Sequence, residues 1–175
     1  MKNIFVCLFV LLSGCASPTI RTSYLEGKWD YPIRTIAIAP TGGILAEAIG
    51  IELLNYDYKI VDIAQTTNLM MRLNLEEVEL SQPQNMSLLA EENIDALLLV
   101  KSVAGYDDNI QSATAKLILT RNNKAVVGII WENASAGQQG SLADRDVRVG
   151  LSYTATQIVR ALIKAFEQHR STDEM

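Results

Sequence analysis

The segment that most constrains the fold is residues 95–100, which read Asp-Ala-Leu-Leu-Leu-Val. Its apolar side chains follow one another without the alternation of a strand that has one face in water. Near-continuous apolar runs of this length are typical of strands that are covered on both faces. Residues 95–100 therefore predict the central strand of a sheet that carries other elements on both sides.

Strand and helix signals alternate before this segment. The predicted elements are a strand at 35–39, a helix at 44–56, a strand at 58–61, a helix at 63–74 and a short helix near 88–89. Pro40 closes the first strand. Asp62 is the expected N-cap of the second helix, and Ser87 is the expected N-cap of the short one.

The pattern changes after Val103. Further strands are predicted at 110–121 and 125–131, joined by a tight turn at Asn122 and Asn123, because asparagine tolerates a positive φ. Together with the central strand they predict an antiparallel meander. Residues 144–168 then carry apolar side chains three and four positions apart, which predicts one long amphipathic helix.

The complete order is strand, helix, strand, helix, a short further helix, three strands and a final helix. It predicts a single mixed α/β domain over residues 33–170, with a mixed parallel and antiparallel sheet and helices packed on it. Residues 171–175 are expected to form a disordered tail. The chain of 175 residues, of which 49% are hydrophobic, is long enough to bury one such core.

The amino-terminal residues have the features of an export signal. Lys2 supplies a positive charge, residues 4–12 are unbroken apolar, and small residues follow them. At about 1.5 Å per residue, the apolar stretch covers about half of a ~30 Å hydrocarbon core, which is too little for a transmembrane helix. Leu12-Ser13-Gly14-Cys15 resembles the lipobox of bacterial lipoproteins, in which the signal is removed before an acylated cysteine.

This resemblance implies that residues 1–14 are a lipoprotein signal peptide and that Cys15 is the lipidation site. Acyl chains on Cys15 would anchor the protein in a membrane. Ala16, rather than Asp, follows the cysteine, as in enterobacterial lipoproteins that are sorted to the outer membrane. The expected location is therefore the outer membrane, facing the periplasm. Residues 15–32 are interpreted as a lipidated tether and lead-in, which reaches at most about 60 Å.

A lipobox followed by this order of elements resembles small lipoproteins whose domain is similar to the amino-terminal domain of TolB, a superfamily that includes the curli secretion lipoprotein. The likeness is carried by residues 35–40, 58–62, 94–100, 113–117 and 124–131. The curli lipoprotein has extra membrane-spanning hairpins, whereas residues 110–131 form one compact hairpin, so a pore is not expected. The resemblance implies an outer-membrane lipoprotein that acts by protein contact as an accessory or assembly factor of an envelope machine.

Composition and residue types argue against several functional classes. The formal net charge of -5 offers no electrostatic footprint for a nucleic-acid backbone. The one histidine, His169, lies near the carboxy terminus, which argues against a Ser-His-Asp triad. With only two cysteines, the chain also lacks the ligands of zinc, haem and iron-sulfur sites. We therefore expect no enzymatic activity, no metal and no cofactor.

The alternative functional class is a periplasmic hydrolase or small-ligand carrier, which needs a concave polar pocket near Gly42 or Asp107. Thr41-Gly42-Gly43 lies where a strand is followed by a helix, a position at which backbone N–H groups can bind phosphate, although a tight turn is the favoured interpretation. Asp107-Asp108-Asn109 offers oxygen atoms to calcium, but its spacing fits a solvated hairpin turn better than an EF-hand loop.

Trp29 and Tyr31 place two large aromatic side chains between the expected anchor and the first predicted strand. One interpretation is that they pack back onto their own domain. The other is that they dock a second copy or an envelope partner, because large aromatic side chains anchor interfaces at low entropic cost. The second interpretation makes Trp29 and Tyr31 candidate partner contacts and leaves self-association open.

Overall fold

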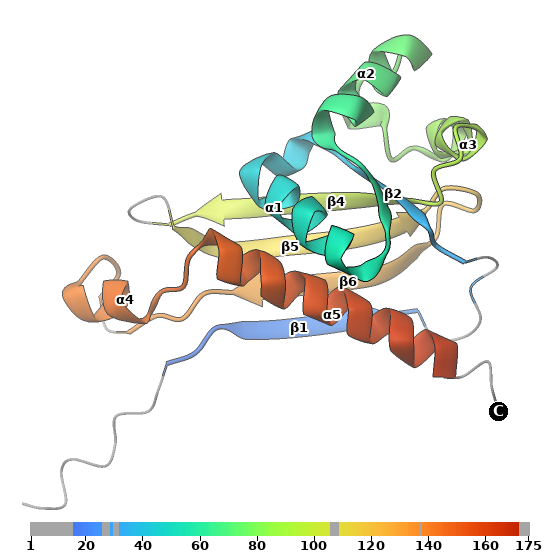
Figure 1. The fold of residues 1–175 in the computed structure, drawn as a ribbon. Coiled ribbons are helices and arrows are strands. Elements are labelled where there is room, and N and C mark those ends of the chain that lie inside the picture. Colours follow the sequence, from blue (N-terminus) through green and yellow to red (C-terminus); the bar gives the residue numbers. More distant parts are fainter. Residues whose placement is uncertain (1–15, 26–28, 30–31, 106–108, 137, 172–175) are drawn as a thin grey trace, which may run out of the picture.

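A six-stranded mixed sheet forms the centre of the computed structural model, which describes residues 16–25, 29, 32–105, 109–136 and 138–171 (Figure 1). The strands are β1 (Thr19–Tyr24), β2 (Thr35–Ile38), β3 (Lys59–Val61), β4 (Ala96–Ala104), β5 (Ile110–Leu119) and β6 (Ala125–Glu132). The helices are α1 (Gly43–Leu53), α2 (Ile63–Leu73), α3 (Pro83–Glu91), α4 (Leu142–Val147) and α5 (Leu151–Ser171). Short 3-10 helices lie at Pro40–Gly42, Leu54–Tyr56 and Glu77–Glu79.

The sheet order is β1-β6-β5-β4-β2-β3, so β4 lies between β5 and β2. Strand β2 pairs in parallel with β3 and β4, whereas β4, β5, β6 and β1 pair antiparallel. The predicted mixed α/β class, the central position of β4 and the meander are confirmed. Asp95, directly before β4, accepts hydrogen bonds from the backbone N–H groups of Arg34 and Thr35, both at 2.9 Å. These bonds link the start of β4 to the start of β2.

The two faces of the sheet carry different helices. Ala96, Leu98 and Val100 of β4 belong to a core cluster that also includes buried side chains of α1 and α5. Leu97 belongs to a second cluster with buried side chains of α2 and α3, and Leu99 packs against that cluster. This alternation explains why the apolar run of β4 is nearly continuous, since both faces of its first half are covered.

The helices predicted at 44–56 and 63–74 correspond to α1 and α2. The Asp62 carboxylate accepts the backbone N–H of Gln65 at 2.7 Å, as expected of an N-cap, and Asn74 ends α2 with a φ of 54°. The prediction that Ser87 caps the short helix is wrong. Helix α3 begins at Pro83, because proline suits the first helical turn, and Ser87 lies inside the helix.

The predicted single helix over 144–168 is divided into α4 and α5. The chain turns extended at Arg148, with φ -74° and ψ 140°, and helix resumes at Leu151. The Asn133 side chain stabilises the break through two hydrogen bonds to Val149, both at 3.0 Å. Its Oδ1 atom accepts the backbone N–H of Val149, and its Nδ2 atom donates to the Val149 carbonyl oxygen. The apolar spacing continues across this break and therefore does not reveal it.

The expectation that residues 15–32 are a lead-in without regular structure is wrong for β1. Residues 19–24 pair antiparallel with β6, in register from Thr19 opposite Glu132 to Tyr24 opposite Val127. All six side chains of β1 are exposed, so this strand is held by its pairing rather than by a buried face. The sheet therefore begins well before Ile33, where the fold was expected to start.

Trp29 packs back onto its own domain. It is only 9% exposed, and its ring meets that of Phe166 in a T-shaped contact with centroids 5.5 Å apart. Tyr58 contacts the same Phe166 ring, also at 5.5 Å. This cluster attaches the segment between β1 and β2 to the carboxy-terminal half of α5, which is the packing interpretation of Trp29. Tyr31 lies outside the described residues.

We predict that Trp29→Ala lowers the free energy of unfolding by about 3–5 kcal/mol, because it removes a buried aromatic side chain and leaves a cavity. Chemical denaturation of the purified full chain measures this change. Tyr153→Ala is the matched control, since Tyr153 is 48% exposed, and its effect should stay within about 0.5 kcal/mol. Equal unfolding midpoints for Trp29→Ala and the unsubstituted protein would contradict the assignment of Trp29 to the core.

Candidate interaction surface

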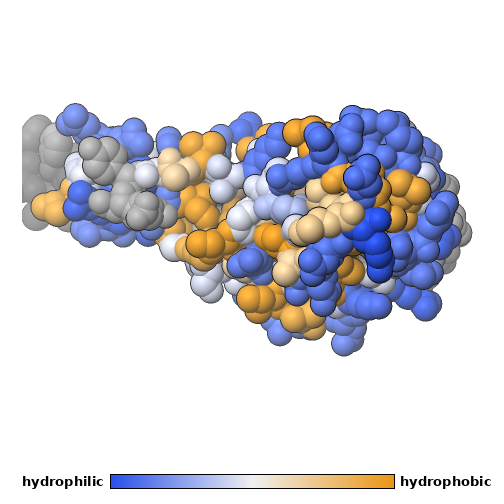
Figure 2. All heavy atoms as spheres, turned by 90° about the horizontal axis from the view of Figure 1, so that it is seen from above, coloured by the Kyte–Doolittle hydropathy of each residue, from blue (hydrophilic) through white to orange (hydrophobic). Residues whose placement is uncertain are grey.

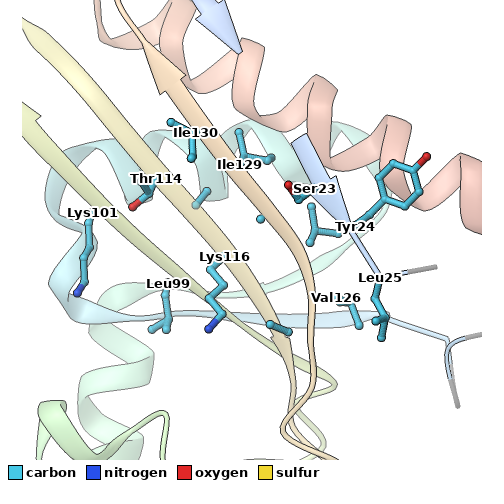
Figure 3. Close-up of a pocket in the computed structure, with 14 residues that line it drawn as sticks. Ser23, Tyr24, Leu25, Leu99, Lys101, Thr114, Lys116, Val126, Ile129 and Ile130 are labelled. Carbon is cyan, nitrogen blue, oxygen red and sulfur yellow. The ribbon is translucent and has the colours of Figure 1, made fainter. Parts of the chain in front are cut away.

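The face of the sheet that carries α2 and α3 is covered over only part of its width. These helices pack around Ala37, Leu97 and Ile118, at the β2 side of the sheet. Farther along the same face, toward β6, Lys101, Lys116 and Ile130 are exposed. A shallow groove of about 670 Å³ lies here and is formed by β1, β4, β5 and β6 (Figure 3). We call it the sheet groove.

Strand register places a defined set of side chains in the sheet groove. Thr114 lies opposite both Lys101 and Ile130, and Gly128 lies opposite both Lys116 and Ser23. Cross-strand partners share one face of a sheet, so these residues lie side by side over four strands. The side chains that shape the groove are Ser23, Leu99, Lys101, Thr114, Lys116 and Ile130.

Gly128 leaves an opening in the groove floor. A Cβ atom built on Gly128 would have only the Ser23 carbonyl oxygen within 4 Å, at 3.9 Å, and the residue does not have the positive φ that would require glycine. Glycine inside a strand often marks a place where another backbone or a ligand approaches closely. Gly128 therefore offers room for a side chain from outside.

The lining favours binding over chemistry. Lys101 and Lys116 are the charged residues among those that line the sheet groove, and most of the others are apolar. A surface of this kind suits an apolar partner that carries negative charge, since each lysine attracts a carboxylate. The hydroxyl groups of Ser23 and Thr114 lie among these residues without a histidine or carboxylate in the lining to activate them.

Among the candidate site residues from the sequence, the structure describes Trp29, which does not line this groove. Trp29 is buried against Phe166 instead. Cys15 and Tyr31, like Asp107, lie outside the described residues. The sequence signal that could have found the groove is Gly128, which interrupts a run of β-branched and aromatic residues at 126–131.

Gly42 has a packing role. Its backbone N–H donates to the carbonyl oxygen of Ala39 at 3.2 Å and closes a tight turn. An added Cβ atom at Gly42 would lie 2.2 Å from the Ala46 Cβ and 3.1 Å from the Val100 Cβ. Close approach of α1 to β4 therefore requires glycine here, in agreement with the tight-turn interpretation.

A buried ion pair orders the segment between β6 and α5. The Arg148 Nη2 and Asp144 Oδ2 atoms are 2.9 Å apart, and their side chains are 4% and 1% exposed. Asp144 also accepts the backbone N–H groups of Gly140 at 2.9 Å and Ala136 at 3.4 Å. The Gly140 hydrogen bond is the largest cause that lowers the pKa of Asp144, and Arg148 and Ala136 add to it, while burial opposes them.

The described residues contain neither a membrane-spanning helix nor a cluster of metal-binding side chains. No helix among them is both long and apolar enough to span a bilayer. Nor do three or more histidine, cysteine or acidic side chains in this part of the chain gather as a metal site would require.

No protein-family model matches the chain, and no curated protein matches it significantly. Among solved structures, a PelC variant dodecamer from Paraburkholderia phytofirmans is similar at 11% identity and a TM-score of 0.47, covering 83% of this chain and 97% of that one. A second PelC dodecamer from that organism has 15% identity and a TM-score of 0.45, covering 83% and 95%. Lipoprotein GNA1162 from Neisseria meningitidis has 16% identity and a TM-score of 0.44, covering 75% and 99%.

With TM-scores below 0.5, these likenesses are too weak to assign the chain to a family. The predicted relationship to the TolB amino-terminal domain and the curli lipoprotein stays a prediction.

We predict that Asp144→Asn destabilises the protein at pH 7 and that the difference from the unsubstituted chain becomes smaller in acid. A carboxylate whose folded-state pKa lies below its ordinary value of 3.8 stabilises the fold above that pH, and this stabilisation is lost as the pH falls through the folded-state pKa. Urea unfolding at pH 7, 5 and 3 measures the difference. Exposed Asp146→Asn is the control. A difference that persists undiminished at the lowest pH would contradict the role of the Asp144 charge.

Proposed function

We propose that this protein is an outer-membrane-anchored periplasmic lipoprotein that acts through protein contacts as an accessory or assembly factor of an envelope machine. The observation that carries the proposal is the sheet groove, an apolar, lysine-bordered hollow on a sheet face that α2 and α3 leave uncovered. Contiguous exposed apolar surface is typical of sites where proteins bind one another.

The position of β1 supports an anchored role. Cys15, the expected acylation site, precedes Thr19 by four positions, and four Cα steps span at most about 14 Å. Since β1 is itself part of the groove, an acylated Cys15 holds the sheet groove close to the membrane. The reach is much shorter than the tether interpretation of residues 15–32 implied, so the partner must itself come to the membrane surface.

The alternative of a periplasmic hydrolase or small-ligand carrier has less support. It requires a polar pocket near Gly42 or Asp107, yet Gly42 is packed against Ala46 and Val100 and does not line the sheet groove. The sheet groove is large enough for a small ligand, but its lining is mostly apolar and open, whereas ligand pockets enclose most of the ligand surface.

We predict that Cys15→Ser releases the protein from the membrane fraction or leaves the signal peptide uncleaved, because serine cannot form the thioether of a lipoprotein. Fractionation of envelopes and acyl labelling measure the outcome. Ser17→Ala in the same segment should change neither. Normal acyl labelling of the Cys15→Ser protein would show that Cys15 is not the anchor.

We predict that a photo-reactive amino acid at position 130, in the sheet groove, crosslinks to an envelope protein in living cells. Gly128→Val in the same chain should reduce the yield by about tenfold, since a side chain then fills the groove floor at a cost of about 1.4 kcal/mol in binding. Valine suits a strand and should not disturb folding.

The matched control is the same amino acid at Lys164, which is exposed on α5, over the opposite face of the sheet. Equal yields at positions 130 and 164, or the same yield with and without Gly128→Val, would contradict the proposal that the sheet groove is the contact surface.

A further inference from the structure

Helix α1 is apolar on nearly all sides. Leu45, Ala46, Ile49 and Leu53 are buried. Ile44 and Ile51 are nevertheless 71% and 68% exposed on the other side, and Leu54, directly after the helix, is 57% exposed. A helix that is apolar all round is normally buried. The exposed apolar side of α1 is therefore the kind of surface that another protein surface covers.

Spacings of three and four positions place Ile44, Glu47, Ile51 and Leu54 along one stripe, which we call the α1 ridge. The ridge borders a second hollow of about 370 Å³ between α1, β3 and the start of α2. Viewed from above, exposed apolar residues gather along the middle of the molecule, while hydrophilic residues cover most of its broad end (Figure 2).

The α1 ridge and the sheet groove have complementary charge. Glu47 and Asp62 are the charged residues among those that line the hollow beside the ridge. Lys101 and Lys116 are the charged residues among those that line the sheet groove. The surface beside the α1 ridge is apolar and carries two carboxylates, whereas the sheet groove is apolar and carries two ammonium groups. The two surfaces are therefore complementary in charge and both apolar.

The two surfaces lie on opposite faces of the sheet. Buried side chains of α1 share a cluster with Leu98 and Val100 of β4, whereas Leu99 and Lys101 of the same strand line the groove on the other face. Because side chains of a strand alternate between faces, the α1 ridge of one chain cannot reach its own sheet groove. Only a ridge from another copy can enter it.

We infer that the sheet groove of one copy receives the α1 ridge of a second copy. Ile51 and Leu54 then lie over the opening at Gly128, and Lys101 and Lys116 approach Glu47 and Asp62 of that copy. This inference rests on the proposed function, since it names the partner of the same groove. It commits to self-association rather than to a different envelope protein.

Such a contact is heterologous, because each copy uses one surface toward one neighbour and a different surface toward the next. Heterologous contacts build closed rings or open filaments rather than pairs. Anchoring every copy to one membrane raises the effective concentration, so that a modest interface suffices for assembly.

Cysteine crosslinking of the full chain in cells tests the contact. A chain that carries both Ile51→Cys and Ile130→Cys should give, on oxidation, a ladder of dimers, trimers and larger species. Either substitution alone should give monomers. Two differently tagged chains, one with Ile51→Cys and the other with Ile130→Cys, should give mixed dimers only. The parent chain, with only Cys7 and Cys15, is the background control.

Charge reversal separates a specific contact from misfolding. Glu47→Lys alone, or Lys101→Glu and Lys116→Glu each alone, should reduce the ladder by about tenfold. Glu47→Lys combined with one of the two lysine reversals should restore it, because the charge pair is then swapped. Failure of both combinations to restore the ladder would overturn the inference.

Further outcomes of the crosslinking experiments would overturn the heterologous contact, self-association or the proposed function. Dimers of Ile51→Cys alone or of Ile130→Cys alone would show an isologous contact and overturn the heterologous arrangement. The absence of every cysteine adduct, together with a retained crosslink from position 130 to a different envelope protein, would overturn self-association and leave the proposed function standing. If neither cysteine adducts between copies nor a photo-crosslink from position 130 forms, the proposed function is contradicted as well.

Discussion

Burial of β4 on both faces is the constraint on which the rest of the structure depends. Leu97 and Leu98 point to opposite sides of the sheet and are both fully buried, so helices are needed on each side. The parallel pairing of β2 with β4 satisfies this need, because the long connection between them contains α1, α2 and α3. Asp95 strengthens the pairing by accepting two backbone N–H groups at the start of β2.

The cover on the two faces is unequal, and the candidate function depends on this difference. Helices α1 and α5 share a core cluster with β2, β4, β5 and β6 on one face, whereas α2 and α3 pack on the β2 side of the other. Along that second face, β4 changes from buried Leu97 through half-buried Leu99 to exposed Lys101. The burial of side chains along β4 therefore shows where α2 and α3 stop covering this face and where the proposed interaction surface begins.

Polar side chains determine the backbone conformation between β6 and α5, where the pattern of apolar residues does not predict it. The Asp144 and Arg148 pair is almost completely buried, and backbone hydrogen bonds to the Asp144 carboxylate offset part of the cost of burying its charge. Gly140 and Ala136 supply N–H groups to Asp144, and Asn133 binds Val149 at the following break. These contacts join residues of a loop, and no periodicity in the sequence marks them.

The sequence by itself determined the elements whose signals are local. The apolar run of β4, the Asp62 cap and the positive φ of Asn123 depend on neighbouring residues and appear as predicted. Only the tertiary structure decided the pairing of β1 with β6, the burial of Trp29 against Phe166 and the meeting of Ser23 with Gly128 in the sheet groove. The physical reason is that these contacts join residues far apart in the chain, and β1 buries no face of its own that would mark it as a strand.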